Sequence, residues 1–160
     1  MEIELVRGTQ RRKHVAGVLV GDRLRVSFPR WMPLEQAREI ADELRQRMER
    51  RVARERIDLE RRAHDLARRH DLPIAESVVW AENQAERWGS CSPEARSIRV
   101  SSRLAAFPDW VLDYVLVHEL AHLAEPNHGP AFHDIVARYA LAERARGFLI
   151  AKDLDPEREV

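Results

Sequence analysis

A nearly apolar stretch, residues 111–123, constrains the possible folds of this chain more than any other feature. Its apolar residues occur on every side of a helix, which is typical of a buried helix and not of an amphipathic one. The same stretch carries His118, Glu119 and His122. Two histidines four residues apart lie on one face of a helix, about one turn from each other. Polar side chains are costly in apolar surroundings unless they are paired, so the stretch predicts a partner for all three.

A metal ion is the partner that fits this pattern best. His118, Glu119 and His122 form the H-E-x-x-H pattern of zinc hydrolases. Imidazole nitrogen suits zinc, and catalytic zinc sites combine three protein ligands with a water. We therefore predict one catalytic zinc ion, although ligation by nitrogen alone also fits manganese, cobalt or nickel.

The third ligand must come from beyond this helix. Pro126 and Asn127 break the helix and favour a turn, which brings His128 back as the third ligand. Glu125 is an alternative ligand in place of His128. The offset of His128 matches the extended motif of metzincins, but Glu125 stands where that motif has glycine, and no Met-turn follows. The ligand spacing is shared, and membership of the metzincins is not implied.

The predicted chemistry assigns Glu119 as the general base. Zinc lowers the pKa of a bound water toward 7, and Glu119 takes the proton and passes it to the leaving amine. Arg87 and Tyr139 are candidates for steadying the oxyanion. Cys91 is expected to be a small core thiol, with contact to the metal or a role as a redox gate as the alternatives. His133 is expected to be a neighbour of the site, with ligation as the alternative.

Composition points to one domain of 160 residues with a core of its own. The 27 basic and 27 acidic residues balance, so no clear nucleic-acid signal is present. One cysteine excludes an internal disulfide. The absence of a signal-peptide pattern and of an apolar run of roughly 18 residues favours a cytoplasmic protein without a membrane span. The oligomeric state stays open.

Local patterns divide the expected domain into three parts. Residues 1–30 read as strands, with a hairpin at Gly21-Asp22, a third strand at 3–7 and an exposed loop at 9–13. Residues 33–71 read as two helices, the second capped by Asp58. The catalytic core, 77–148, should contain strands at 77–80 and 96–101 around a turn-rich segment at 86–93. The buried helix follows from Pro108, then one last helix from Pro130 and a frayed end at 151–160.

The chain also resembles a known family between Trp80 and Gly147. The matching residues are Arg87-Trp88-Gly89-Ser90-Cys91, then 110–123, then Asn127-His128-Gly129 and Phe132. They resemble the YgjP-like, M48-type metallopeptidases, a family of metal-dependent hydrolases similar to SprT-type proteases. The resemblance implies an α+β, zincin-like fold, with a small mixed or antiparallel sheet packed on helices. It also implies His118, His122 and His128 on zinc and Glu119 as base. One departure is His133, where relatives usually carry Trp.

The resemblance further implies a peptide or protein substrate that pairs with an edge strand above the active-site helix. The candidate strand is 97–101, with Ile98 in contact with substrate and Arg87, Trp88 and Tyr139 around it. The alternatives are a zinc hydrolase of a nucleoside triphosphate, a SprT-like protease acting near DNA, and a non-catalytic zinc-binding module. No glycine-rich phosphate loop is present, which weighs against a nucleotide. Glu119 weighs against a structural zinc site, which needs no base.

Overall fold

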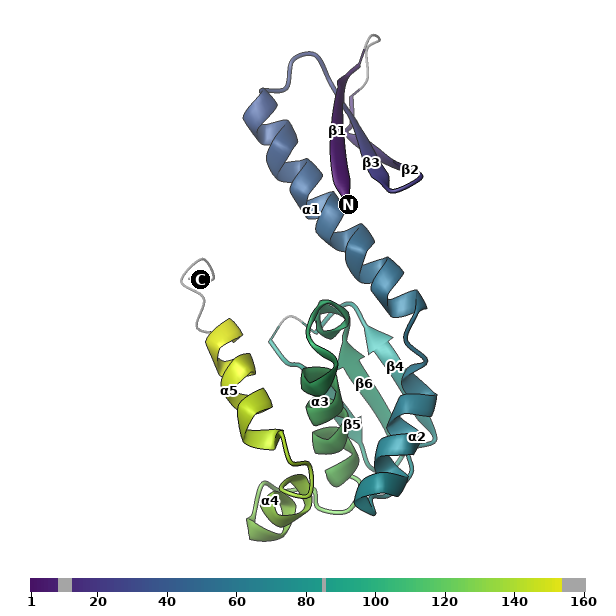
Figure 1. The fold of residues 1–160 in the computed structure, drawn as a ribbon, viewed down its shortest axis with the longest axis vertical. Helices are drawn as coiled ribbons and strands as arrows, with labels where there is room; N and C mark the ends of the chain where they lie inside the picture. The colour runs from purple at the N-terminus through teal and green to yellow at the C-terminus, as the bar shows by residue number, and fades with distance from the viewer. Residues whose placement is uncertain (9–12, 85, 154–160) are drawn as a thin grey trace. The chain divides into compact units, whose positions relative to one another are not determined.

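The computed structural model describes residues 1–8, 13–84 and 86–153. The chain divides into two compact units, Met1–Ala53 and Arg54–Val160 (Figure 1). The expectation of one domain over residues 1–160 stays a prediction. Most of the loop expected at 9–13 and of the frayed end expected at 151–160 lies outside the described residues.

The first unit begins with a three-stranded mixed sheet in the order β1-β3-β2. Strands β2 (Ala16–Val20) and β3 (Arg23–Phe28) form the predicted antiparallel hairpin, and β1 (Glu2–Arg7) pairs with β3 in parallel. Gly21 occupies the turn with φ 63°, a left-handed conformation that glycine adopts without steric cost. The predicted hairpin and third strand are therefore confirmed.

Helix α1 (Leu34–Glu55) covers one face of this sheet. It contributes only small buried residues, Ala37 and Ala41, which pack against the apolar side chains of β3. The rest of α1 is dominated by arginine and glutamate. Helix α1 therefore contributes few fully buried side chains to the core of the first unit.

The second unit begins with helix α2 (Leu59–His70). The side chain of Asp58 accepts a hydrogen bond of 3.0 Å from the backbone N–H of Arg61, which caps the first turn. Two helices with a cap at Asp58 are as predicted from the sequence.

A second three-stranded sheet follows in the order β4-β6-β5. Strands β4 (Ser77–Ala81) and β6 (Ser97–Ser101) lie where strands were predicted, and they pair in parallel. Strand β5 (Gly89–Ser92) pairs antiparallel with β6 and lies inside the segment predicted as turn-rich. Gly, Ser, Cys and Ser have weak strand propensities, so nothing in the local sequence marks β5 as a strand.

The placement of β6 corrects the predicted edge strand. β6 is hydrogen-bonded on both sides, to β4 and to β5, so no peptide can add to it. Ile98 on β6 is completely buried and cannot contact a substrate, so the prediction for Ile98 is wrong. The edge next to the active-site helix belongs to β5.

The remaining elements are short or helical. They are η1 (Ser102–Ala106), α3 (Asp109–Ala121), α4 (Pro130–Val136) and α5 (Ala142–Asp153). The single last helix predicted from Pro130 is wrong, because α4 ends at Val136 and the chain turns before α5.

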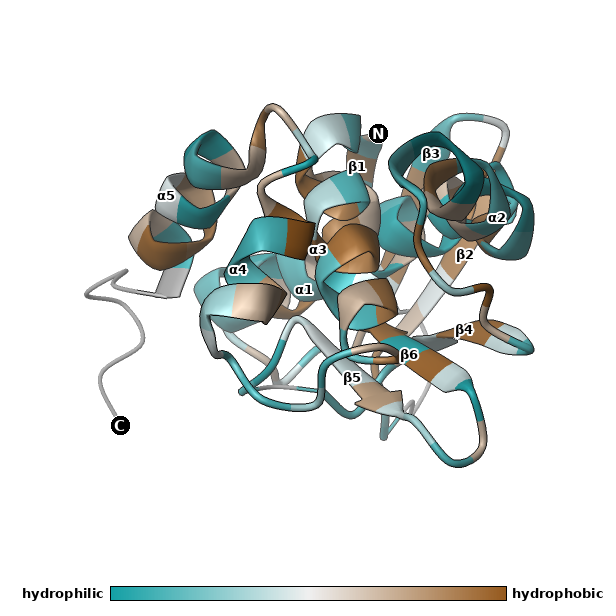
Figure 2. Cartoon of the chain, turned by 90° about the horizontal axis from the view of Figure 1, so that it is seen from below, coloured by the Kyte–Doolittle hydropathy of each residue, from teal (hydrophilic) through white to brown (hydrophobic). Residues whose placement is uncertain are grey.

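The core of the second unit lies between its sheet and helices α2, α3 and α5. Hydrophobic residues concentrate on α3 and β6, as the brown segments of Figure 2 show. The buried side chains of α3 come from every side of the helix, as predicted: Val111, Leu112, Val115, Leu116, Val117 and Leu120. Within the described part of the chain, no helix is both long and apolar enough to cross a membrane. The observed architecture is α+β, as predicted.

Candidate metal centre

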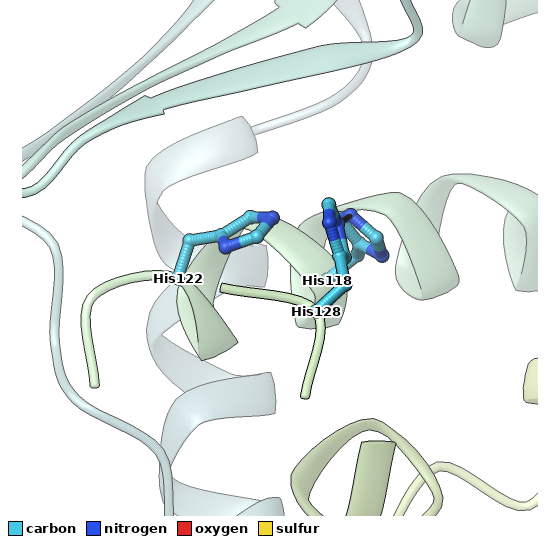
Figure 3. A group of neighbouring side chains, drawn as sticks. All are labelled: His118, His122 and His128. Atoms are coloured by element: carbon cyan, nitrogen blue, oxygen red, sulfur yellow. Dashed lines mark hydrogen bonds between the residues drawn. The ribbon is translucent and has the colours of Figure 1, made fainter. Parts of the chain in front are cut away.

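The three predicted ligands come together at the end of α3. His118 lies in the last turn of α3, and His122 directly follows the helix as its C-cap. The chain then turns at 123–127, and His128 precedes α4. One nitrogen from each ring lies within 4.8 Å of the others, and the Nε2 atoms of His118 and His128 are 3.2 Å apart. Figure 3 shows the three rings turned toward a common space.

Phe132 of α4 forms an apolar floor under the three rings. Its ring stacks on His122 with centroids 4.5 Å apart and meets His118 and His128 edge-on at 4.9 and 4.7 Å. Phe132 is almost fully buried. It therefore limits the rotation of the imidazoles and shields one side of the centre from water.

The protonation of these rings fits a metal ion. Burial, together with the smaller effects of the neighbouring His122, His128 and His133, lowers the pKa of His118 to about 4. Burial also lowers the pKa of His122. The Nδ1 atom of His122 lies 3.2 Å from the carbonyl oxygen of Glu125, a contact that fixes the tautomer with Nε2 unprotonated. Neutral imidazoles with free lone pairs are the form that binds metals.

The alternative ligands do not join this group. Among the described residues, the only cluster of potential ligand atoms consists of His118, His122 and His128. Glu125 contributes its backbone carbonyl to His122 and no carboxylate oxygen to the cluster. Cys91 is half-buried on β5, and burial together with Glu119 raises the pKa of its thiol to about 11. A thiol with such a pKa stays protonated at neutral pH and is a poor ligand.

Glu119 lies beside the histidines in sequence and is buried with 6% of its surface exposed. Burial raises the pKa of its carboxyl to about 7, against a smaller opposing effect of the Arg87 charge. Gly89 of β5 approaches this carboxylate closely. A Cβ atom placed on Gly89 would lie 2.5 Å from Oε1 of Glu119, closer than any side chain tolerates. Any larger residue at position 89 would therefore require the Glu119 side chain or β5 to shift.

Of the residues predicted to bind substrate, Arg87 and Tyr139 line hollows on the surface, whereas Trp88 packs against the core. Arg87 lies close enough to Glu119 to act on its pKa, and it lines a polar hollow of about 390 Å³ along β5. The ring of Trp88 is covered by the guanidinium of Arg103 at 3.9 Å and packs against Phe107, so it serves the core. The hydroxyl of Tyr139 donates a hydrogen bond of 3.0 Å to the carbonyl of Trp110, and its ring faces a cavity.

That cavity, of about 740 Å³, opens directly beside His118 and His128. His133 lines it but is not part of the ligand cluster. Its far walls are formed by α3 and α5 and include Tyr114, Glu143 and Arg146. Glu143 and Arg146 carry no local sequence signal for this cavity, because only the turn between α4 and α5 brings α5 next to the metal centre. Tyr114 lies one helical turn before His118, and this spacing is the signal that could have identified it.

Comparison with protein families identifies the domain. The model of the YgjP-like metallopeptidase domain matches residues 42–144, which is more than half of the chain. The chain belongs to the YgjP-like metallopeptidase family. The resemblance found in the sequence is thereby confirmed, and so is a metallopeptidase-type hydrolase. A search of curated proteins gave no match to this YgjP-like domain.

A solved structure supports the fold of this YgjP-like domain. The crystal structure of the metallopeptidase zymogen of Methanocaldococcus jannaschii jannalysin matches it with a TM-score of 0.52 and 17% sequence identity. The match covers 62% of the YgjP-like chain and 100% of the jannalysin chain. At this identity the likeness shows the fold alone, and it is a metallopeptidase fold, as expected. A metallopeptidase implies a metal ion, and the three histidines are the described residues able to hold one.

Proposed function

We propose that this YgjP-like domain is a zinc-dependent peptidase with Glu119 as its general base. The observation that carries the proposal is the convergence of His118, His122 and His128 within 4.8 Å beside the buried Glu119. The three imidazoles would hold one zinc ion, since nitrogen ligands suit zinc and three protein ligands are typical of catalytic zinc sites. When bound, zinc supplies a Lewis acid that polarises a carbonyl and makes water acidic enough to react near neutral pH.

Glu119 is suited to moving a proton in both directions. A pKa near 7 allows the carboxylate to take a proton from water and to return it to the leaving amine at neutral pH. Arg87 contributes a positive charge that acts on Glu119, and it is the better of the two predicted candidates for steadying an oxyanion. Tyr139 is the weaker one, since its hydroxyl already donates to Trp110.

The edge of β5 supports an extended peptide as the substrate. The backbone carbonyl of Trp88 accepts a hydrogen bond from the backbone N–H of Ser101 on β6. In an antiparallel pair every second residue forms such bonds, so the backbone groups of residues 88, 90 and 92 bond to β6. Gly89 and Cys91 then direct their backbone N–H and C=O groups away from β6, toward the open edge. A peptide that added to this edge would pass the carboxylate of Glu119 at Gly89.

Metal analysis and peptide cleavage test the proposal together. The native protein should contain about one zinc ion per chain, and His128→Ala should lose most of it. Glu119→Gln should keep zinc but lose roughly 10²- to 10⁴-fold in kcat on unfolded protein or peptides, as expected for removal of a general base. Native protein without metal, or Glu119→Gln with native activity, would contradict the proposal. Cleavage of nucleoside triphosphates in place of peptides would favour the alternative substrate class.

A further inference from the structure

The cavity beside the metal centre is large enough to hold part of a substrate. Its volume of about 740 Å³ lies within the range of roughly 300–1,000 Å³ that small-ligand pockets span. One end is formed by His118 and His128, and the opposite wall by α5. A peptide whose scissile bond lies at the histidines would therefore place its neighbouring residues in this cavity.

Two side chains with hydrogen-bond donors, Tyr114 and Arg146, line this cavity. Tyr114 of α3 is half-buried, and its ring lies 6.0 Å from that of His118. Arg146 of α5 lines the same cavity and is exposed to solvent. Within residues 1–8, 13–84 and 86–153, neither the Tyr114 hydroxyl nor the Arg146 guanidinium forms a hydrogen bond or an ion pair. Donors left free on a cavity wall are available to a ligand.

Arg146 and Tyr114 lie close enough to interact. Burial is the main cause of the raised pKa of Tyr114, and the Arg146 charge is the next largest influence, in the opposite direction. Glu143, one turn before Arg146, acts on Tyr114 less strongly. Asp134 is the other carboxylate on the cavity wall. Arg146 is thus the strongest single charge acting on the pKa of Tyr114, with Glu143 and Glu119 acting in the opposite direction.

We propose that Tyr114 and Arg146 form a subsite that binds a carboxylate of the substrate, one or two residues from the scissile bond. The guanidinium offers paired N–H donors that match a carboxylate, and the phenol adds a third donor. The carboxylate is either the C-terminus of a peptide or an acidic side chain. The inference rests on the proposed peptidase function and adds a substrate class to it.

Matched substrates measure this preference. The native enzyme would cleave fluorogenic peptides that share one sequence and end in either a free carboxylate or an amide. A second pair would carry Glu or Gln beside the scissile bond, ahead of an amidated end. The subsite predicts a ratio of kcat/KM above one for carboxylate over amide, or for Glu over Gln. The first pair identifies a terminal carboxylate, and the second an acidic side chain.

Variants of α5 assign the preference to Arg146. Arg146→Gln should lower the ratio about tenfold, as expected for the loss of a charged hydrogen bond, and Arg146→Lys should recover part of it. Glu143→Gln should raise the ratio, because it removes a competing negative charge. Arg144→Gln is the matched control, since Arg144 lies on the same helix but stacks over Trp110 outside the cavity. An unchanged ratio in Arg146→Gln would overturn the subsite while leaving the peptidase intact.

A binding measurement makes the subsite testable without catalysis. Trialanine with a free carboxylate and trialanine amide would be titrated into metal-free protein and followed by NMR. Without metal, discrimination between the two must come from the protein itself. The carboxylate form should bind several-fold more tightly, and Arg146→Gln and Tyr114→Phe should both reduce the difference. Equal binding of the two peptides by the native protein would contradict the subsite even if no peptide were cleaved.

Discussion

The two sheets of this protein share one topology, but they differ in what packs on them: the second packs on the helix that carries the candidate metal centre. In each, the first strand pairs in parallel with the third, and the second strand pairs antiparallel with the same third strand. The orders β1-β3-β2 and β4-β6-β5 are therefore equivalent. In the first sheet the hairpin strand β2 is exposed along its whole length. In the second, the equivalent strand β5 is half-buried and contacts α3.

The difference lies in the helix that packs on each sheet. Helix α1 buries two alanines and leaves its charged face in solvent. Helix α3 is apolar on all sides and holds Glu119 against β5. The two hairpin strands show the same contrast at their glycines. A Cβ on Gly17 would meet Leu24 and Leu44 at an ordinary 3.4 Å, whereas a Cβ on Gly89 would collide with the Glu119 carboxylate. The shared strand topology thus does not account for the difference between the two sheets, and the buried helix with its carboxylate does.

The largest expected effect concerns the buried carboxylate in metal-free protein. The pKa of Glu119 is raised from 4.5 to about 7 by burial. Below pH 4.5 the group is protonated in both the folded and the unfolded states. As the pH rises to 7, only the unfolded state loses the proton, so folding stability falls. At about 1.4 kcal/mol per pKa unit, the loss reaches roughly 3 kcal/mol above pH 7.

Urea denaturation of metal-free protein at several pH values measures this effect. The stability of Glu119→Gln relative to native should increase by roughly 3 kcal/mol between pH 4.5 and 7.5. The control is Glu4→Gln in the first sheet, where the exposed ion pair with Arg25 is worth about 1 kcal/mol or less. If the difference in folding stability between Glu119→Gln and native protein did not change with pH, the carboxylate would not be held in apolar surroundings.

The two glycines give the next largest effect. Gly89→Ala forces Glu119 and β5 apart and should destabilise the fold by about 1–3 kcal/mol, as overpacking does. It should also lower kcat more than it raises KM, because the displaced group is the proposed base. Gly17→Ala should change stability by about 0.5 kcal/mol or less. Thermal denaturation and steady-state kinetics of Gly89→Ala and Gly17→Ala measure these effects. Equal losses of stability and of kcat in the two variants would contradict the contrast between the two sheets.

The smallest expected effect tests the open edge of β5. Cys91→Pro removes one N–H that we infer points away from β6, so it should raise KM for peptides by about fivefold, equivalent to one hydrogen bond. Ser90→Pro removes an N–H that bonds to β6, and it should instead lower the melting temperature. Zinc content reports whether the centre survives in each variant. An unchanged KM in folded Cys91→Pro would exclude strand addition at this edge.

Local sequence rules predicted the elements whose signals are local. The hairpin at Gly21, the cap at Asp58 and the buried helix with His118 and His122 depend on residues within a few positions of each other. The return of His128 followed from the turn residues just before it. The edge strand and the last helix were predicted incorrectly. The four small residues of β5 carry no strand signal, and the turn between α4 and α5 contains no strong helix breaker.

The sequence by itself predicted the three histidines that converge and the buried glutamate beside them, because helical spacing and one turn suffice to gather them. Only the tertiary structure decided which strand forms the edge beside Glu119, because strand order depends on pairing between distant segments. It also placed Gly89 against the carboxylate and brought Tyr114 and Arg146 into one cavity. These contacts join residues that are 30 or more positions apart, and no local pattern encodes such distances. The residues of the proposed metal centre thus lie in one short stretch, whereas the residues proposed to bind substrate come together only through packing.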